Sequence, residues 1–282
     1  MKLSTALRLG RVSNLPTVTS NVLAAVALAG GRPSTLTLVI VCTALSLMYV
    51  AGMWLNDAFD RDIDRVERPE RPIPSGEVAA ATVFDLGFVM LVGGVVLVVA
   101  AAFTSGAGWK PIMSVVSLAS LIVFYNAYHK QNPLSPVIMG LCRVAVYTTA
   151  ALLVRADLCV DVLIGCSLLL CYLIGLTYAA RSENLRELAE AWPLAFLGIP
   201  FLVAFPGEPQ AVVIYVVFAV WVVRALQSIR AGDIRTGITS LIAGISLLDA
   251  LLIANTGRSD LVLPTIAAFA LTTTLQRVVP GT

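Results

Sequence analysis

The chain has 282 residues, of which 58% are hydrophobic and only 13% charged, with a mean hydropathy of +0.89. Soluble domains carry about 25% charged residues, so this composition excludes an ordinary soluble globular protein. The net charge of +2 is too small to indicate a nucleic-acid partner. The five cysteines lie in or beside apolar runs without any CxxC pair, which indicates packing rather than disulfides or metal binding.

Apolar runs of the length needed to span a bilayer, about 20 residues, follow one another along the chain. The first follows Lys2, Arg8 and Arg11 like a secretory signal, but we interpret it as a retained span because the rest is equally apolar. The runs are too long and alternate too little for barrel strands, so helices are expected. The predicted fold is all-α: one domain over residues 1–282, a polytopic transmembrane bundle of nine or ten helices around a central cavity. The predicted segments are 14–30, 36–56, 80–104, 110–128, 134–154, 158–179, 190–205, 209–229, 236–255 and 260–277, of which the seventh and tenth are short enough to be partly buried or re-entrant.

The orientation follows from the positive charges, which favour the cytoplasmic side of membrane proteins. With the N-terminus inside, 14 of the 19 Lys and Arg residues fall on the inner side. Arg32, Lys110, Arg155 and Arg258 fall outside, and Arg143 lies within a span. We therefore predict a multi-pass protein of the inner, cytoplasmic membrane whose N-terminus and active site face the cytoplasm.

An acidic stretch ends the second predicted span. If the helix continues through it, Asp57, Asp60 and Asp64 lie within about 60° of one another on one face. Three such carboxylates repel each other unless a cation lies between them, and Mg²⁺ prefers oxygen ligands while also binding substrate phosphates. Asn56 adds a further oxygen. The alternative is a solvated helix end whose acids pair with nearby arginines.

A proline-rich loop follows at residues 65–76 and carries Arg65, Arg68 and Arg71. Guanidinium groups bind phosphate with paired hydrogen bonds. Predicted metal ligands and predicted phosphate ligands are therefore adjacent in the sequence.

At these residues the chain resembles the UbiA superfamily of intramembrane prenyltransferases. Asn56, Asp57, Asp60 and Asp64 match its signature NDxxDxxxD, and residues 71–76 match its RPxPSG-like segment. Stretches 125–130, 132–136 and 139–143 are most similar to the UbiA-like member encoded in bacterial ebo operons. The resemblance implies a bundle of about nine helices over most of the chain.

The resemblance also implies a diphosphate-binding lysine in a YxxxK pattern, which this chain does not match. Tyr125 is followed four residues later by His129, and Lys130 comes next. Either the lysine has shifted by one position or His129 takes its place, and both are candidate diphosphate ligands.

The second acidic motif of the family, typically DxxxD, also differs here. The corresponding stretch contains no aspartate, but Glu183 and Glu187 are spaced four residues apart and could hold a second Mg²⁺. The alternative is an ordinary charged loop on the inner side.

Arg143 lies inside the fifth predicted span, where a charge is costly and usually has a partner or a function. It could face the diphosphate in the cavity, or pair with Asp85 or Asp249. Asn14 and Asn21 on the first span could line the same cavity or join helices by hydrogen bonds.

The resemblance implies Mg²⁺-dependent transfer of a prenyl group from a polyprenyl diphosphate to an aromatic or other lipophilic acceptor. The catalytic carboxylates would then be Asp57, Asp60 and Asp64. The alternative function is a non-catalytic membrane carrier of an isoprenoid or aromatic metabolite. The DxxDGxxAR pattern of CDP-alcohol phosphotransferases is not matched, because Arg61 follows Asp60.

Overall fold

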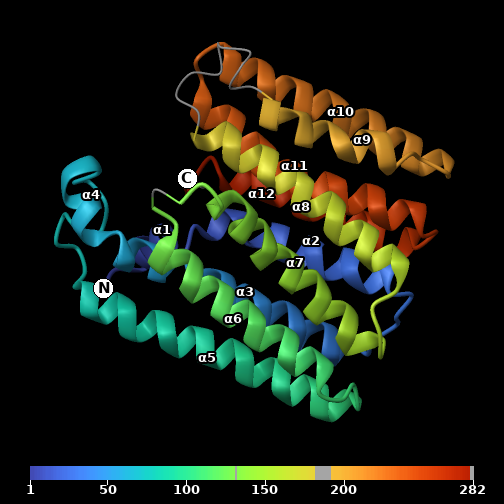
Figure 1. The fold of residues 1–282 in the computed structure, drawn as a ribbon, viewed down its shortest axis with the longest axis horizontal. Helices are drawn as coiled ribbons and strands as arrows, with labels where there is room; N and C mark the ends of the chain where they lie inside the picture. Colours follow the sequence, from blue (N-terminus) through green and yellow to red (C-terminus); the bar gives the residue numbers. More distant parts are fainter. Residues whose placement is uncertain (131, 182–191, 280–282) are drawn as a thin grey trace.

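The computed structural model describes residues 1–130, 132–181 and 192–279, and all regular structure in these ranges is helical. Figure 1 shows the long helices lying side by side as one bundle, with the N-terminus and the C-terminal end of α12 on the side that carries α4. In chain order the elements are α1 (Leu3–Leu9), the 3-10 helix η1 (Val12–Asn14), α2 (Leu15–Leu28), α3 (Thr35–Phe59), α4 (Arg61–Glu67), α5 (Ala80–Ser105), α6 (Lys110–Tyr128), α7 (Ser135–Val154), α8 (Val160–Arg181), the 3-10 helix η2 (Trp192–Gly198), α9 (Ile199–Val203), α10 (Pro209–Arg230), α11 (Ile234–Asn255) and α12 (Ser259–Leu275).

Several helix ends are fixed by local sequence. The Ser34 side chain accepts a hydrogen bond from the Thr37 amide (3.1 Å) at the start of α3, and Asp233 caps α11 through the Thr236 amide in the same way (3.1 Å). Gly106 ends α5 with φ of 68°, a conformation that costs a glycine nothing.

The bundle has inner helices and lipid-facing helices. In the most apolar 18-residue stretch of α11, 83% of residues are buried, against 28–33% for α3, α5, α6 and α10. The short helix α2 is almost entirely buried and packs against α7, α11 and α12. Wide apolar faces such as Val89, Val92 and Phe103 on α5 are exposed, which suits hydrocarbon and not water. The chain is therefore a multi-pass integral membrane protein.

The predicted spans correspond closely to the observed helices. Within the described ranges, seven helices are long and apolar enough to cross a membrane, and three shorter apolar stretches are Val12–Leu28, Leu194–Val203 and Ser259–Leu275. The prediction of an all-α bundle is confirmed, and so is the shortness of the seventh and tenth segments. The short helices α1 and α4 are additions that the hydropathy pattern did not indicate.

The helix of the second span does not continue through the acidic stretch as expected. α3 ends at Phe59, Asp60 forms the junction, and α4 begins at Arg61. The Asp64 amide still donates to the Asp60 carbonyl (2.8 Å), so the two helices share a turn while changing direction. In Figure 1, α4 projects beyond the end of the bundle. The acidic residues are therefore brought together by a bend rather than by one helical face.

The contact between α3 and α5 depends on a glycine. A Cβ on Gly94 would lie 2.3 Å from Cγ of Met48 and 2.9 Å from the Ala44 carbonyl oxygen, whereas on Gly93 it would meet only Leu47, at 3.4 Å. We expect Gly94→Ala to lower the free energy of unfolding by about 1–3 kcal/mol, because the backbone of α3 must move away. The matched control Gly93→Ala should change it by less than about 0.5 kcal/mol. Thermal unfolding in detergent measures both, and equal midpoints would contradict the close packing.

Candidate functional site

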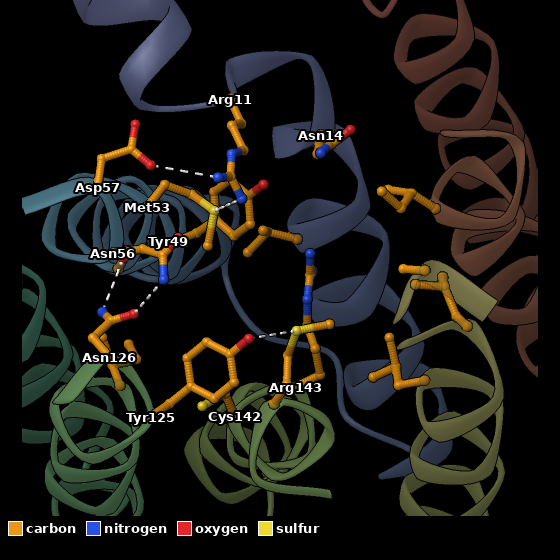
Figure 2. Close-up of a pocket in the computed structure, with 18 of the residues that line it drawn as sticks. Arg11, Asn14, Tyr49, Met53, Asn56, Asp57, Tyr125, Asn126, Cys142 and Arg143 are labelled. Carbon is orange, nitrogen blue, oxygen red and sulfur yellow. Dashed lines mark hydrogen bonds and ion pairs between the residues drawn. The ribbon is translucent and has the colours of Figure 1, made fainter. Parts of the chain in front are cut away.

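A cavity of about 930 Å³ opens between the helices at the end of the bundle near α4. Its outer part is polar and its inner part is mostly apolar, with Arg143 as a charged exception, and Figure 2 shows Asp57 and Arg143 on different sides of the cavity. The polar outer wall includes Arg11, Asn56, Asp57, Arg68 and Arg71, and the apolar wall includes Leu45, Met48, Leu118, Leu173 and Ile245. The cavity therefore offers both a charged and a hydrocarbon environment to one ligand.

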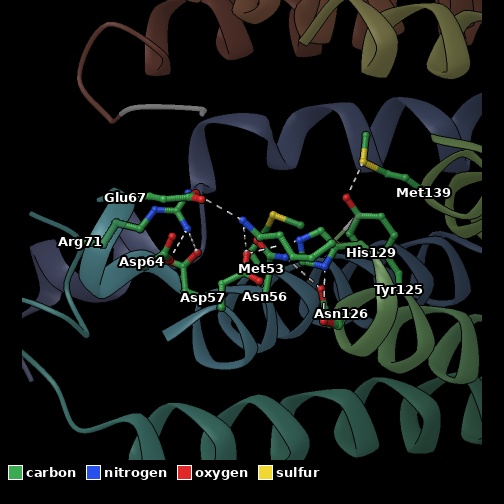
Figure 3. A network of polar contacts seen from close by, with 12 residues as sticks. Met53, Asn56, Asp57, Asp64, Glu67, Arg71, Tyr125, Asn126, His129 and Met139 are labelled. Atoms are coloured by element: carbon green, nitrogen blue, oxygen red, sulfur yellow. Dashed lines mark hydrogen bonds and ion pairs between the residues drawn. The ribbon is translucent and has the colours of Figure 1, made fainter. Parts of the chain in front are cut away.

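Arg71 joins two of the predicted acidic residues (Figure 3). Its Nη1 donates to Oδ1 of Asp57 (3.2 Å) and to Oδ2 of Asp64 (2.7 Å). The Arg71 side chain is 14% exposed, and those of Asp57 and Asp64 are 9% and 1% exposed. Because one nitrogen reaches both carboxylates, the bend at Asp60 brings them close together despite the break between α3 and α4.

The third carboxylate faces the end of α6. Nε2 of His129 lies 3.4 Å from Oδ2 of Asp60, and Nζ of Lys130 lies 4.0 Å from the same oxygen and 3.7 Å from Glu67. The His129 ring stacks on Tyr125, with ring centroids 5.0 Å apart. Both residues that the YxxxK comparison left open are therefore placed at the acidic cluster.

Asn56 is held by the opposite helix. Its Nδ2 donates to Oδ1 of Asn126 (3.3 Å), whose own amide donates to the Gly52 carbonyl (3.0 Å). This leaves the side-chain oxygen of Asn56 as the atom that a ligand can use. Asn126 is a supporting residue that the motif comparison did not identify.

Arg11 is a further cavity residue that the sequence did not single out. Its Nη2 lies 3.4 Å from Oδ1 of Asp57, and its backbone has φ of 42°, the one positive value among the described non-glycine residues. Left-handed backbone at a non-glycine residue costs about 1 kcal/mol or more and concentrates at functional sites. Only its position among the inner positive charges could have indicated this role.

The short helix α1 is tied to the loop after Arg71. Arg8 donates to Oε1 of Glu77 (2.6 Å) and Thr5 donates to Oε2 (2.7 Å). These hydrogen bonds, from Arg8 first and then from Thr5, lower the pKa of Glu77, which therefore stays ionised. The contact holds α1 and the loop together beside the cavity, which both Arg8 and Arg71 line.

The other predicted loop residues differ in placement. Arg68 lines the cavity, but the Arg65 side chain is 69% exposed and pairs with Asp62 at 3.4 Å, away from the buried carboxylates. Glu183 and Glu187 lie outside the described residues, so their predicted role in a second metal site stays a prediction.

Arg143 lies in the inner part of the cavity. It donates from Nη1 to Oδ1 of Asn21 (2.9 Å) and from Nη2 to Oγ1 of Thr17 (3.1 Å). Its guanidinium carbon stands 5.2 Å from the centre of the Tyr49 ring, a cation–π contact. Within the described ranges its hydrogen bonds go to Asn21 and Thr17 and not to Asp85 or Asp249, and Asn21 in turn donates to Asp249.

The residues fit a divalent cation of the Mg²⁺ type. Oδ1 of Asp64 is buried and has no hydrogen-bond partner among the residues that the structure describes, and such an orphaned carboxylate oxygen is costly without a ligand. No group of three His, Cys, Asp or Glu side chains in the described ranges is already gathered tightly enough to enclose a metal. The oxygen donors of Asn56, Asp57, Asp60 and Asp64 are nevertheless those that Mg²⁺ takes when it also binds phosphate. The arrangement therefore suits a ligand with a phosphate head and an apolar tail.

Sequence comparison identifies related proteins. A model of the UbiA prenyltransferase family matches residues 17–260. The digeranylgeranylglyceryl phosphate synthase of Thermococcus kodakarensis is 29% identical over 103 residues, which are 36% of this chain and 35% of that protein. Across curated relatives of that name, the chain matches between 21% and 35% of their length.

Solved structures show the same fold over nearly the whole chain. A UbiA homologue from Aeropyrum pernix K1 superimposes with a TM-score of 0.67 over 85% of this chain and 97% of that one, at 15% identity. A UbiA homologue from Archaeoglobus fulgidus, bound to GPP and Mg²⁺, superimposes with a TM-score of 0.54 over 96% and 99% of the two chains, at 13% identity. The likeness at this identity is one of fold.

Two substitutions of Arg11 separate the energetic cost of its backbone conformation from the contribution of its side chain. Arg11→Gly and Arg11→Ala both remove the contact with Asp57, but only alanine keeps the Cβ that makes φ of 42° costly. We expect the glycine variant to be about 1 kcal/mol more stable than the alanine variant. Midpoints of thermal unfolding in detergent compare them, and an alanine variant of equal stability would show that this backbone is unstrained.

Proposed function

Since this chain belongs to the UbiA prenyltransferase family, we propose that it transfers a prenyl group from a polyprenyl diphosphate to an aromatic or other lipophilic acceptor, with Mg²⁺. The supporting observation is the two-part cavity, whose cationic and acidic outer end continues into an apolar interior. A diphosphate fits the first part and an isoprenoid tail fits the second. The Archaeoglobus fulgidus homologue binds a ligand of this class together with Mg²⁺.

In this proposal the outer residues hold the head of the donor. Asn56, Asp57, Asp60 and Asp64 hold Mg²⁺, while Arg71 and Arg11, already beside Asp57, bind diphosphate oxygens. Arg68 and Lys130 are close enough to contribute positive charge, and His129 reaches Asp60. When bound, Mg²⁺ supplies Lewis-acid stabilisation of the negative charge on the diphosphate leaving group.

The apolar residues perform the second task, which is to hold the tail and exclude water. Leu45, Met48 and Leu118 are fully or nearly fully buried at the cavity wall. The bond between the first prenyl carbon and the diphosphate oxygen breaks, and the diphosphate leaves with the electron pair. The acceptor then forms a bond to that carbon and gives up a proton. Water in the site would compete with the acceptor, so a dry wall favours transfer over hydrolysis.

Three finer assignments remain predictions. The excess of Lys and Arg on the side of the acidic residues favours a cytoplasmic active site in the inner membrane. Glu183 and Glu187 are predicted to supply the second metal site. The likeness to the UbiA-like member of ebo operons rests on stretches 125–130, 132–136 and 139–143, whereas the curated relatives described above are archaeal synthases.

The acidic residues give a direct test of donor binding. We expect Asp57→Asn and Asp64→Asn each to weaken Mg²⁺-dependent binding of geranyl diphosphate by at least about tenfold, because each removes a charged ligand worth ~1.5–3 kcal/mol. The control Asp62→Asn lies in the same stretch, but its side chain is 64% exposed and pairs only with Arg61 and Arg65 among the described residues. It should bind normally. Calorimetry with and without EDTA measures all four proteins, and tight binding in EDTA would contradict the metal.

The carrier alternative predicts a different outcome. A carrier binds geranyl diphosphate with Mg²⁺ but releases no inorganic diphosphate with any acceptor. An enzyme releases it, and the release disappears in Asp57→Asn. A phosphate-release assay with membrane lipid extracts as the acceptor source separates the two functions.

A further inference from the structure

A buried polar network lies at the inner end of the cavity, centred on Asp249 in the middle of α11. Asp249 is fully buried and accepts hydrogen bonds from Ser20 (2.5 Å) and from Nδ2 of Asn21 (2.8 Å), both on α2. Tyr147 on α7 donates to its other oxygen. Asp249 itself does not line the cavity. Three helices therefore meet at a carboxylate that no cavity ligand touches.

The network has a direction, because each group can play only one role. An ionised carboxylate accepts hydrogen bonds and donates none. Asp249 therefore faces the NH₂ of Asn21, and the amide oxygen of Asn21 points the other way, toward Arg143, whose Nη1 donates to it (2.9 Å). Asp249 thus helps to fix the orientation of Arg143 through a single intervening side chain, Asn21.

Arg143, unlike Asp249, does line the cavity. Its bonds to Asn21 and Thr17 use one N–H on each terminal nitrogen. A guanidinium has five N–H donors, so three remain without a partner in the described ranges of the chain. Tyr49 covers one face of the group at 5.2 Å. The guanidinium of Arg143 is therefore fixed in position while three of its N–H donors remain available to a ligand.

This cationic site is separate from the one at Asp57. Tyr49, whose ring contacts Arg143, precedes Asn56 by seven residues on α3. Seven residues are about two helical turns, so the two positions are roughly 10.5 Å apart along the helix axis. The outer site has its own cations, Arg11 and Arg71, bound to Asp57. A diphosphate at the outer end is already served by these cations, so the guanidinium of Arg143 deeper in the cavity is available to a second ligand.

The burial of Asp249 and Arg143 costs free energy, which argues against a purely structural role for the network. An ionisable side chain within a membrane-spanning bundle is costly and by default marks function. The helix contacts around Asp249 could be made by apolar residues, as they are along the rest of α11, where Leu248, Ala250 and Leu251 are fully buried. What only the polar set provides is a fixed guanidinium in the cavity.

We propose that Arg143 forms an inner anion-binding site that takes the carboxylate or phosphate group of the prenyl acceptor, with Asp249 and Asn21 as positioning residues. The inference rests on the proposed function, in which the diphosphate occupies the outer site. The first prenyl carbon then lies between the two sites. An acceptor anchored at Arg143 presents its nucleophilic atom toward that carbon, and this spacing favours acceptors that carry an oxyanion at one end.

The test uses the purified full-length protein in detergent, beginning with Mg²⁺-dependent binding of geranyl diphosphate. Acceptor binding is then measured with two pairs of probes: 4-hydroxybenzoate against its methyl ester, and an alkylglyceryl phosphate against the matching alkylglycerol. Each pair differs in the anionic group, and the two pairs distinguish a carboxylate source from a phosphate source. The wild-type protein should bind the acidic member of one pair about tenfold or more tightly than the neutral member, as expected for a hydrogen bond between charged groups.

Arg143→Gln and Asp249→Asn should both abolish this preference while leaving the Kd for geranyl diphosphate within about threefold, since the outer site is untouched. Asp249→Asn keeps the shape but removes the negative charge that holds the Asn21 NH₂, and it places an NH₂ against either Tyr147 or the donors on α2. The double variant should be no worse than Arg143→Gln alone, because Asp249 acts only through Arg143. Ser246→Ala is the matched control, because Ser246 is buried one turn away and, within the described ranges, its side chain hydrogen-bonds to Ser20 (3.0 Å) and not to Asp249 or Arg143.

Each other outcome has a defined meaning. If Arg143→Gln weakens geranyl diphosphate binding instead, Arg143 belongs to the outer site and the inference is wrong. A wild-type protein that binds geranyl diphosphate but neither acidic probe overturns the inner site and leaves the proposed function standing. Failure to bind geranyl diphosphate contradicts the proposed function, while the acidic preference still tests Arg143. If Asp249→Asn does not yield monodisperse protein, Asn21→Ala removes the side chain that links Asp249 to Arg143, and an unchanged preference in that variant overturns the positioning.

Discussion

The structure depends on the compensation of buried charge within an apolar bundle. Asp57 and Asp64 can lie almost completely buried because one nitrogen of Arg71 contacts both. Removing one partner of a buried ion pair is strongly destabilising, since it leaves a charge without water or a counter-ion. The loop that carries Arg71 is therefore tied to the end of α3 by electrostatics, and α1 is tied to the same loop through Arg8 and Glu77. These ion pairs therefore hold together the three segments that form the mouth of the cavity: α1, the loop with Arg71 and the end of α3.

The same constraint separates the cavity into two parts. Lipid-facing helices such as α5 and α10 supply apolar surface, whereas the inner helices α2 and α11 carry the buried polar groups. Because α2 is almost entirely buried within the protein, it tolerates Thr17, Ser20 and Asn21, which would be costly on a lipid-facing helix. Several buried polar side chains gather where the short α2 passes, and that is where Arg143 finds its partners.

Much of the fold could be predicted from the sequence, because apolar length and positive charge are local signals. The spans, the proline-rich loop and the first acidic motif all lie within single stretches of chain. The bend at Asp60 could not be predicted from the sequence, because no glycine or proline lies there. The positive φ of Arg11 could not be predicted either. The contact of Asn21 with Asp249 joins residues 228 positions apart. Pairings of this kind depend on which helices become neighbours, and hydropathy does not contain that information.

Charge balance at the outer site bears on how the proposed ligands bind. Within the described ranges, Asp57, Asp60 and Asp64 face Arg11, Arg71 and Lys130, and Lys130 also faces the more exposed Glu67, so the buried carboxylates are already matched by cations. A diphosphate entering alone would add several negative charges to this balanced, partly desolvated cluster, and a divalent cation entering alone would add positive charge. Neither change is favourable where water is scarce. On the proposed function, diphosphate and cation therefore bind best together, because only their combination returns the cluster close to neutrality.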